Sequence, residues 1–421
     1  MINWKKYFDH IYCIHSTFYP ERLEKIKNEL QRVNILDSGI FSWKISSGDF
    51  VQYIEYNDVN YIYNPDDQNK NKLIDLCKNY AEIFEDTIIN DYQKILILED
   101  DIYFLKDYVS LYLKDNDEIF DFEYREAKNY FYNIAIKRAI KNIGKVSVND
   151  GYFDLETAYG YGGCFTNSND FNFIKKAFKK YEQKCFNENI IAEFMRFHPF
   201  NDFAFKFGSL FDMCLENREV VYLNLKYSKD ERWADYSSNT RNILRKCQKE
   251  LILKESDDID TFMSLYKKTM DRHLADSFYY FKKDYFVKLL KNDNSKLFEV
   301  IKDGKVISSA IFMFGEDFCH YHLSANDYEM RKFNANYFML DEMFNLAKLL
   351  GKKYFILGGG SSINQNDSLF AFKQKFSKLK KPFFIAGKVY NQEIYQKYNK
   401  IWQNQSKENI KFFLKYRLEQ K

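Results

Sequence analysis

The feature that most constrains this chain is a run of three glycines, Gly358–Gly360, directly after the apolar segment Phe355–Leu357. Glycine adopts positive φ angles at little cost, so a strand that ends in such a run can turn sharply and bring its backbone close to a ligand. A polar stretch follows, and two phenylalanines then bracket Lys373 and Lys375. We expect this arrangement to hold a lysine against a sheet edge, where it can stabilise an oxyanion or a phosphate. The alternative is a surface turn followed by an ordinary basic strand.

Three further motifs precede this one. They are Tyr152–Gly163 (YFDLETAYGYGG), Glu193–Pro199 (EFMRFHP) and Ser238–Lys246 (SNTRNILRK). Together the four motifs resemble those of the FemX-like aminoacyltransferases, a branch of the GNAT acyltransferase superfamily, over roughly residues 115–400. The resemblance implies an α/β fold in which two GNAT-like halves with mixed sheets pack together, over residues 113–228 and residues 229–421.

The first 112 residues have a different pattern. Asp9–Ile14 and Lys94–Leu98 are short apolar segments typical of buried strands, and Pro20–Leu30 has apolar residues at helical spacing. Three carboxylates, Glu99 to Asp101, follow the last of these strands. Ligands of α/β sheets usually bind at the carboxyl ends of strands, so the pattern indicates an α/β unit with a binding edge.

This N-terminal segment resembles the start of glycosyltransferase family 25, in which an acidic cluster helps to hold a metal and a nucleotide sugar. The resemblance places Arg22, Glu99 and Asp101 at the nucleotide sugar. It ends near residue 108, so we expect a truncated glycosyltransferase-like domain over residues 1–112. Such a domain either transfers a sugar or serves as a docking or scaffolding remnant.

The composition narrows the classes of partner. The net charge of +3 and the pI of about 8.2 are close to neutral for 421 residues, which argues against a DNA-binding protein. Tyr and Phe are abundant together with Lys, Asn and Ile, so we attribute them to A/T-rich codons rather than to stacking surfaces. The seven cysteines form no C-x-x-C pair. That pattern is typical of free thiols in a reducing compartment and predicts neither disulfides nor a zinc site.

The chain shows no pattern that directs it out of the cytoplasm. No basic-then-apolar leader opens the sequence, and no apolar run approaches the roughly 18 residues of a membrane span. These observations predict a cytoplasmic protein. Peripheral membrane association through lysine and aromatic side chains stays open.

Acyl transfer to an amine requires a positioned donor, a neutral amine and a stabilised oxyanion, but no nucleophilic side chain. The resemblance implies that Lys373 faces the reacting carbonyl. Asp367 and Lys375 belong to the same motif, and we expect them beside the substrate. The alternative for Lys373 is a solvated lysine on a basic strand.

A basic row is predicted on a helix over residues 228–250. Arg241 and Arg245 are one helical turn apart on the same face, Lys249 is a further turn on, and Lys246 is on the same helix. Such a row suits the phosphates of a nucleotide, a lipid carrier or a tRNA acceptor stem. A solvated helix face is the equally weighted alternative.

The turn of the second motif contains Tyr159, Tyr161 and Gly162 among closely spaced glycines. Such a turn permits close approach of the backbone to a ligand, and its tyrosines can contact a sugar or a pyrophosphate. Arg196 and His198 follow at the end of a predicted strand. We expect all five residues to bind substrate.

His320 and His322 are two residues apart in a predicted strand and therefore share one face. The sequence shows no third ligand nearby, so a metal site is not predicted. His322 is a candidate general base toward an acceptor amine, and a packed strand histidine is the alternative.

The segment Leu323–Asn334 contains no glycine, although acetyl-CoA-dependent GNAT enzymes hold the pyrophosphate there on a glycine-containing loop. The resemblance implies aminoacyl-tRNA as the acyl donor, and acyl-CoA or carrier-bound donors stay open. The predicted function is transfer of an acyl or aminoacyl group to an amine of a free or lipid-linked cell-envelope glycan or glycopeptide precursor. The alternatives are a metal-dependent glycosyltransferase and a non-catalytic scaffold of envelope polysaccharide synthesis.

Overall fold

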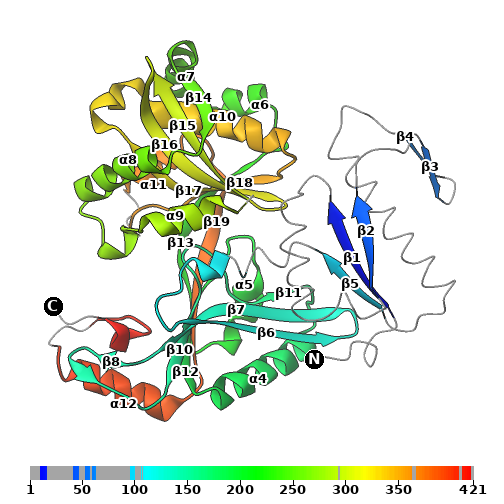
Figure 1. Cartoon of the computed structure of the whole chain (residues 1–421), viewed down its shortest axis with the longest axis vertical. Helices are drawn as coiled ribbons and strands as arrows, with labels where there is room; N and C mark the ends of the chain where they lie inside the picture. The colour runs from blue at the N-terminus through cyan, green and yellow to red at the C-terminus, as the bar shows by residue number, and fades with distance from the viewer. Residues whose placement is uncertain are drawn as a thin grey trace. The chain divides into compact units, whose positions relative to one another are not determined.

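The computed structural model describes residues 106, 108–292, 294–362, 367–406 and 410–418 with their side chains, and only the backbone of five strands before residue 105. The chain divides into two compact units, Met1–Phe104 and Leu105–Lys421. In the first unit, three parallel strands form a sheet in the order β2-β1-β5, and β3 pairs with β4 (Figure 1). These strands are β1 (His10–Ser16), β2 (Phe41–Ser46), β3 (Tyr53–Tyr56), β4 (Val59–Ile62) and β5 (Ile95–Glu99).

Little of the expected glycosyltransferase-like site falls within the described residues. Glu99 is the last residue of β5, as expected for a carboxylate at a strand end. Arg22, Asp101 and the helix predicted over Pro20–Leu30 lie outside the described residues.

The second unit alternates strands and helices. Its strands are β6 (Glu118–Glu126), β7 (Asn129–Ala139), β8 (Asn142–Ile143), β9 (Val146–Ser147), β10 (Phe153–Glu156), β11 (Phe165–Thr166), β12 (Ile190–Arg196), β13 (Met213–Asn224), β14 (Ile252–Ser256), β15 (Ser295–Lys302), β16 (Lys305–Phe314), β17 (Phe318–Asn326), β18 (Tyr354–Gly358) and β19 (Lys380–Val389). Its α-helices are α4 (Phe171–Asn187), α5 (Phe203–Phe207), α6 (Lys229–Asp235), α7 (Ser238–Glu250), α8 (Ile259–Arg272), α9 (Lys283–Leu290), α10 (Ala335–Leu349), α11 (Ser368–Lys373) and α12 (Gln392–Gln403). The short 3-10 helices are η2 (Gly208–Leu210), η3 (Ser277–Tyr279), η4 (Tyr328–Phe333) and η5 (Lys415–Arg417).

One mixed sheet contains most of these strands, in the order β11-β7-β10-β12-β19-β13-β18-β17-β16-β15-β14, with β6 on β7. Two neighbouring pairs are parallel, β10 with β12 and β17 with β18. A helix connects the strands of each parallel pair, α4 in the first and α10 in the second. The unit therefore repeats one strand–helix–strand motif in two halves, which agrees with the mixed sheets that the sequence predicts.

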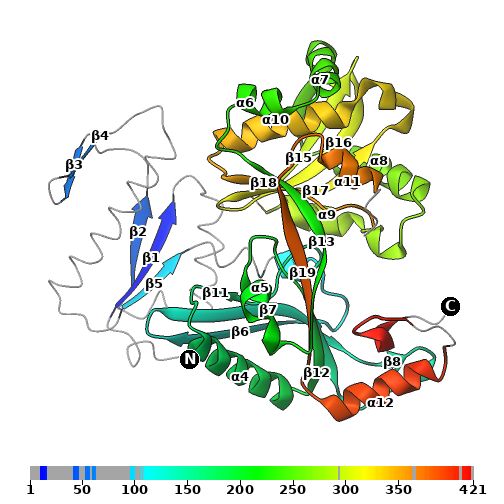
Figure 2. The ribbon, with the colours of Figure 1, turned by 180° about the vertical axis from the view of Figure 1, so that it is seen from behind.

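Two long strands join the halves. β13 and β19 pair antiparallel, and both cross from one half to the other (Figures 1 and 2). The last residues of β19 pair with β12 of the first half. Helix α12 also packs there, because Tyr398 and Trp402 share a core with Ile191 and Phe194. The C-terminal part of the range 229–421 thus completes the sheet of the first half.

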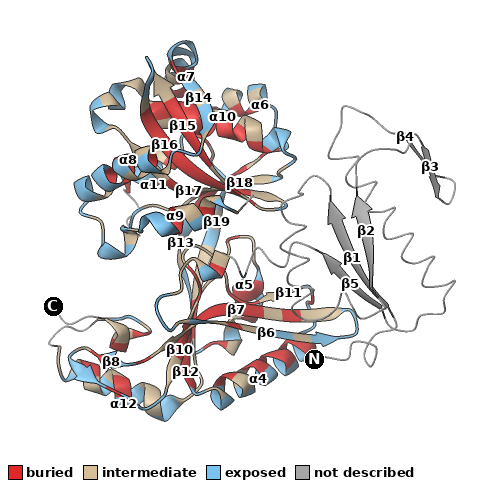
Figure 3. Cartoon of the chain, in the orientation of Figure 1, coloured by how far each residue is buried: buried red, intermediate tan, exposed pale blue. Residues whose placement is uncertain are grey.

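Each half has its own apolar core, built on the helix between its parallel strands. Helix α4 buries Phe173, Ile174, Phe178 and Tyr181 at helical spacing, and its N-cap Asp170 accepts a hydrogen bond from the amide of Asn172. Helix α10 is buried over most of its surface against strands β15–β18 (Figure 3). These cores hold the sheet edges that carry the candidate site.

The structure corrects two local predictions. The expected single helix over residues 228–250 is two helices, α6 and α7, because Ser237 between them caps α7 by accepting from the amide of Thr240 at 3.2 Å. Lys373 does not lie on a strand at a sheet edge. It ends the short helix α11, which Asp367 caps through the amide of Phe370.

Candidate functional site

The two parallel strands of the second half separate within a few residues. β17 and β18 pair only from Phe318 to His320 and from Tyr354 to Ile356. Beyond these residues, β17 pairs with β16 alone, and Gly358 at the end of β18 pairs with β13. His322 and Gly358 are each two residues past the last pair, and each strand has a β-bulge there, at His322 in β17 and at Leu357 in β18.

Lys373 reaches the glycine run from α11. Its side chain is only 7% exposed, and its Nζ donates a hydrogen bond to the carbonyl oxygen of Gly359 at 2.6 Å. A Cβ atom at position 358 would lie 3.2 Å from this Nζ, and Gly358 has a φ of +86°. Burial lowers the pKa of Lys373 to about 8, against the opposing effect of Asp367. Near neutral pH the site therefore holds a buried cation that is close to its titration point.

Asp367 organises the loop between β18 and α11. Its carboxylate accepts hydrogen bonds from the hydroxyl of Ser361 at 2.5 Å and from the amides of Phe370 and Ser362, both at 2.9 Å. Burial raises its pKa, but these hydrogen bonds outweigh burial and hold the pKa well below its usual range. A Cβ at Gly360 would lie 2.6 Å from the Asp367 carboxyl carbon. The predicted substrate contact of Asp367 thus competes with these internal bonds.

Arg218 on β13 is a further part of this site that the sequence did not indicate. Its Nη1 donates to the carbonyl oxygen of Gly360 at 3.2 Å. A Cβ at Gly359 would lie 3.0 Å from its Cδ. The glycine run is therefore enclosed by two cationic side chains, Lys373 and Arg218. Arg218 lies 140 residues before the start of the run, so no local pattern relates them.

The tyrosine turn and His198 of the first half meet the histidines of β17. Nε2 of His198 lies 3.3 Å from Nε2 of His320. The ring of Tyr161 is 5.3 Å from that of His198 and 5.8 Å from that of His320, and the rings of Tyr159 and His322 are 6.0 Å apart, all between centroids. Residues from two of the four motifs and from β17 are thereby brought together.

Three tyrosines extend this cluster. The hydroxyl of Tyr285 lies 3.0 Å from Nε2 of His322 and 2.6 Å from the hydroxyl of Tyr112. The Tyr112 hydroxyl is 3.2 Å from that of Tyr108, which donates to the carbonyl oxygen of Tyr159 at 2.6 Å. The four-residue spacing of Tyr108 and Tyr112 is the one sequence signal for this group.

The histidines of the cluster are neutral. Burial lowers the pKa of His320 to about 4 and that of His322 to about 3, and it also holds the pKa of His198 well below its usual range. Burial likewise raises the pKa of Tyr159 to about 12. At neutral pH each imidazole therefore carries a single proton.

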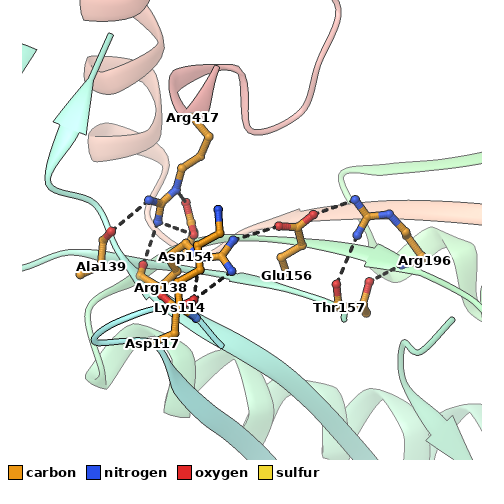
Figure 4. Close-up of polar contacts among 9 residues, drawn as sticks. All are labelled: Lys114, Asp117, Arg138, Ala139, Asp154, Glu156, Thr157, Arg196 and Arg417. Atoms are coloured by element: carbon orange, nitrogen blue, oxygen red, sulfur yellow. Dashed lines mark hydrogen bonds and ion pairs between the residues drawn. The ribbon is translucent and has the colours of Figure 1, made fainter. Parts of the chain in front are cut away.

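Arg196 and Gly162 hold the tyrosine turn in place. The amide of Gly162 donates to the carbonyl oxygen of Arg196 at 2.7 Å. The Arg196 guanidinium donates to Glu156 at 2.7 Å and to the carbonyl oxygen of Thr157 at 3.2 Å (Figure 4). Glu156 in turn lies 3.3 Å from Arg138. Arg196 was predicted to bind substrate, and in the structure its guanidinium has partners within the protein.

The predicted basic row is divided between two roles. Nη1 of Arg241 donates to the carbonyl oxygens of Trp233, Ala234 and Tyr236 at the C-terminal end of α6, so Arg241 caps that helix. Arg245 and Lys246 are exposed. Lys375 is also exposed, and its Nζ donates to the hydroxyl of Tyr337 at 2.7 Å.

The part of the chain that the structure describes contains no group of three or more His, Cys, Asp or Glu side chains placed to hold a metal ion. Among the same residues, no helix is both long and apolar enough to cross a lipid bilayer.

Comparison with known proteins supports the architecture. Residues 234–373 match the family model described as Acetyltransferase (GNAT) domain. The crystal structure of FemX is similar over 69% of this chain and 92% of that chain, with 14% sequence identity and a TM-score of 0.56. The chain therefore has a FemX-like GNAT fold in its second unit.

Two further solved structures are more distant. One is L-PGS from Bacillus licheniformis, with 12% identity over 68% of this chain and 87% of that chain and a TM-score of 0.42. The other is a tandem GNAT protein from the clavulanic acid biosynthesis pathway, with 7% identity over 66% and 85% and a TM-score of 0.40. No curated protein sequence matches this chain.

Proposed function

We propose that this protein is an acyltransferase that moves an acyl or aminoacyl group onto an amine of a cell-envelope glycan or glycopeptide precursor. The GNAT family match and the FemX-like fold support acyl transfer in general. The observation that carries the proposal is Lys373, a buried lysine at the glycine run beside the separating strands. A preorganised cation at a buried site can stabilise the oxyanion of an acyl-transfer intermediate.

Acetyl-CoA, the donor that the GNAT family model implies, does not fit the residues that would hold its pyrophosphate. The segment between β17 and α10 contains no glycine and is wound into η4. Two of its amides are already used, since the amide of Glu329 donates to the Asp327 side chain at 3.0 Å and that of Asn334 to the carbonyl oxygen of Arg331 at 3.1 Å. An aminoacyl ester such as aminoacyl-tRNA is therefore the first donor to test.

In the proposed reaction, the amine nitrogen attacks the ester carbonyl of the donor, and Lys373 stabilises the negative oxygen. The new N–C bond forms, the C–O bond of the ester breaks, and the proton of the amine ends on the leaving oxygen. His322 is the proposed group that accepts this proton. Tyr159, Tyr161 and His198 are proposed to line the acceptor side.

The test is transfer of radiolabelled amino acids from a mixture of aminoacyl-tRNAs to amino-sugar and peptidoglycan-type acceptors, with acyl-CoAs assayed in parallel. We expect amide formation with an aminoacyl-tRNA and a loss of about 100- to 1,000-fold in Lys373→Met. Transfer from acyl-CoA alone would contradict the proposed donor class. A rate that Lys373→Met lowers only a few-fold would remove Lys373 from the oxyanion role.

A further inference from the structure

We infer that His320 and His322 carry opposite tautomers and together form the binding site for the acceptor amine. In this site Nδ1 of His322 accepts the proton of the amine, and the Nδ1–H of His320 donates to an oxygen of the same acceptor. The inference deepens the proposed function and rests on it for the chemistry. The tautomers themselves follow from the hydrogen bonds of the neutral side chains and do not depend on the proposed function.

The tyrosine chain assigns the tautomer of His322. A backbone carbonyl only accepts, so the single proton of the Tyr108 hydroxyl is donated to the Tyr159 carbonyl oxygen at 2.6 Å. Tyr108 must then accept from Tyr112, and Tyr112 must accept from Tyr285. Tyr285 has donated its own proton, so it accepts from Nε2–H of His322 at 3.0 Å. A neutral imidazole has one N–H, which leaves Nδ1 of His322 with a free lone pair.

His198 assigns the opposite tautomer to His320. The amide of Phe200 donates to Nδ1 of His198 at 3.2 Å, so the proton of neutral His198 is on Nε2. That proton is donated to Nε2 of His320 at 3.3 Å. His320 therefore accepts at Nε2 and carries its own proton on Nδ1. Both tautomer assignments require neutral histidines, and burial keeps His320 and His322 neutral by lowering their pKa values.

The two Nδ1 atoms are available to a ligand. Among the residues that the structure describes, neither has a hydrogen-bond partner. β17 has a β-bulge at His322, where Leu323 pairs with Ile311 and Tyr321 with Phe312, so regular alternation does not place the two side chains. Both rings lie instead against the tyrosine turn of the first half. The neighbouring rings belong to Tyr159, Tyr161 and Tyr108. Burial, which lowers the pKa of both histidines, likewise favours a neutral amine over an ammonium ion, and only the neutral amine is a nucleophile.

Proton transfer through His322 then balances. As the N–C bond forms, Nδ1 takes a proton from the amine, and it returns that proton to the leaving oxygen when the C–O bond breaks. The imidazole ends in its starting tautomer. His322 contacts the reacting nitrogen, whereas Tyr285, Tyr112 and Tyr108 are positioning residues that act through it. Their contribution is to keep Nδ1 unprotonated and aimed at the acceptor.

Nitrogen-15 NMR of histidine-labelled full-length protein near pH 7.5 tests the tautomers directly. The chain has six histidines, so His320 and His322 are assigned by the signals lost in His320→Gln and His322→Gln. We expect protonated Nε2 at His322 and protonated Nδ1 at His320. We expect Tyr285→Phe to give a mixture of tautomers at His322 only. The matched control is Tyr280→Phe. The hydroxyl of exposed Tyr280 donates to Asp271 and takes no part in the hydrogen bonds that connect Tyr108, Tyr112, Tyr285 and His322. Identical tautomers at the two histidines, or no change in Tyr285→Phe, would overturn the assignment.

A second measurement tests the amine site without requiring turnover. D-glucosamine, added at pH 8.5 to keep part of its amine neutral, should shift the Nδ1 resonance of His322. N-acetylglucosamine has no free amine and should leave that resonance in place. Equal effects of the two sugars, or none, would overturn the amine site.

Activity separates this inference from the proposed function. With a productive donor, His322→Gln should lower kcat by about 100-fold or more and Tyr285→Phe by about 10-fold, with KM nearly unchanged. Opposite tautomers and a glucosamine shift without transfer from any donor would leave the site standing and remove the function. Transfer that is unaffected by His322→Gln would leave the proposed function standing and remove the amine site.

Discussion

At the scale of single residues, the buried cation of Lys373 lowers the stability of the folded protein. Its cation is buried, its one strong contact is the carbonyl of Gly359, and the nearest anion, Asp367, is already satisfied by hydroxyl and amide donors. Burial lowers its pKa from 10.5 to about 8. A depressed lysine pKa means that the unfolded chain binds more protons between pH 8 and pH 10.5, so stability increases with pH across that interval.

We therefore predict that Lys373→Met stabilises the protein while it removes activity. The pKa shift corresponds to a penalty of about 3 kcal/mol at neutral pH, and loss of the hydrogen bond to Gly359 offsets about 1 kcal/mol of the gain. Chemical denaturation should show a higher free energy of unfolding at pH 7, with the difference shrinking toward pH 10.5. The exposed Lys378→Met is the control, with no change expected in either property. Destabilisation by Lys373→Met would indicate a structural role.

The same lysine predicts the basic limb of the pH profile. An oxyanion donor must be protonated, so kcat/KM should fall as the pH rises through about 8. Lys373→Arg, which stays charged, should have a lower rate but no such limb. His322 should add no limb between pH 5 and 8, because burial lowers its pKa to about 3. A basic limb that persists unchanged in Lys373→Arg would assign it to another group.

The glycine run gives a third prediction at this scale. A Cβ at Gly360 would lie 2.6 Å from the Asp367 carboxyl carbon, so Gly360→Ala must displace the cap of α11. We expect a loss of about 1–3 kcal/mol in the free energy of unfolding and a loss of transfer activity. Gly315→Ala is the control, since its nearest contact would be 3.8 Å away. Equal thermal stability and activity of the two variants would show that the loop adapts freely.

At the scale of elements, the C-terminal segment is tied to the first half by Arg417. Its guanidinium contacts both carboxylate oxygens of buried Asp154, at 2.6 and 2.7 Å, and it donates to the carbonyl oxygens of Ala139 and Arg138 (Figure 4). Asp154 is in β10, the strand that leads into the tyrosine turn. The anchor of η5 thus also supports the acceptor side of the candidate site.

Breaking the ion pair between Arg417 and Asp154 should strongly destabilise the protein. We predict that Arg417→Met lowers the free energy of unfolding by about 3–5 kcal/mol, because Asp154 is left buried and unpaired. The double variant Arg417→Met with Asp154→Asn should recover part of that loss, as the uncompensated charge is removed. A thermal denaturation series of the two single variants and the double variant measures this. Purely additive effects would contradict a direct charge coupling.

At the scale of the whole molecule, the two halves of the second unit share strands. β12 pairs with β19, which follows it by about 190 residues, and the core of α12 lies on the first half. A fragment of residues 105–228 therefore lacks both β19 and α12. We predict that this fragment does not fold alone, which near-ultraviolet circular dichroism and proteolysis will show. A cooperative melting transition of the fragment would contradict the shared architecture.

Much of the fold follows from local sequence patterns. Residues 171–185 have apolar side chains at helical spacing and form α4, and the apolar runs between residues 297 and 324 form β15, β16 and β17. Such elements can be read from the sequence because helical and strand periodicity depend on neighbours within a few residues. The break between α6 and α7 was missed because Ser237 is a strong N-cap within an otherwise continuous polar pattern.

The sequence by itself determined the order of elements, the GNAT-like motifs and the residue types of the candidate site: Lys373, the histidines of β17 and the tyrosine turn. Only the tertiary structure decided which of them meet. The contacts of Tyr285 with Tyr112 and of His198 with His320 join residues more than 100 positions apart. Such contacts depend on strand order and register across the whole sheet. The proton position on each histidine is a property of that assembled network, because a neutral imidazole takes its tautomer from its partners.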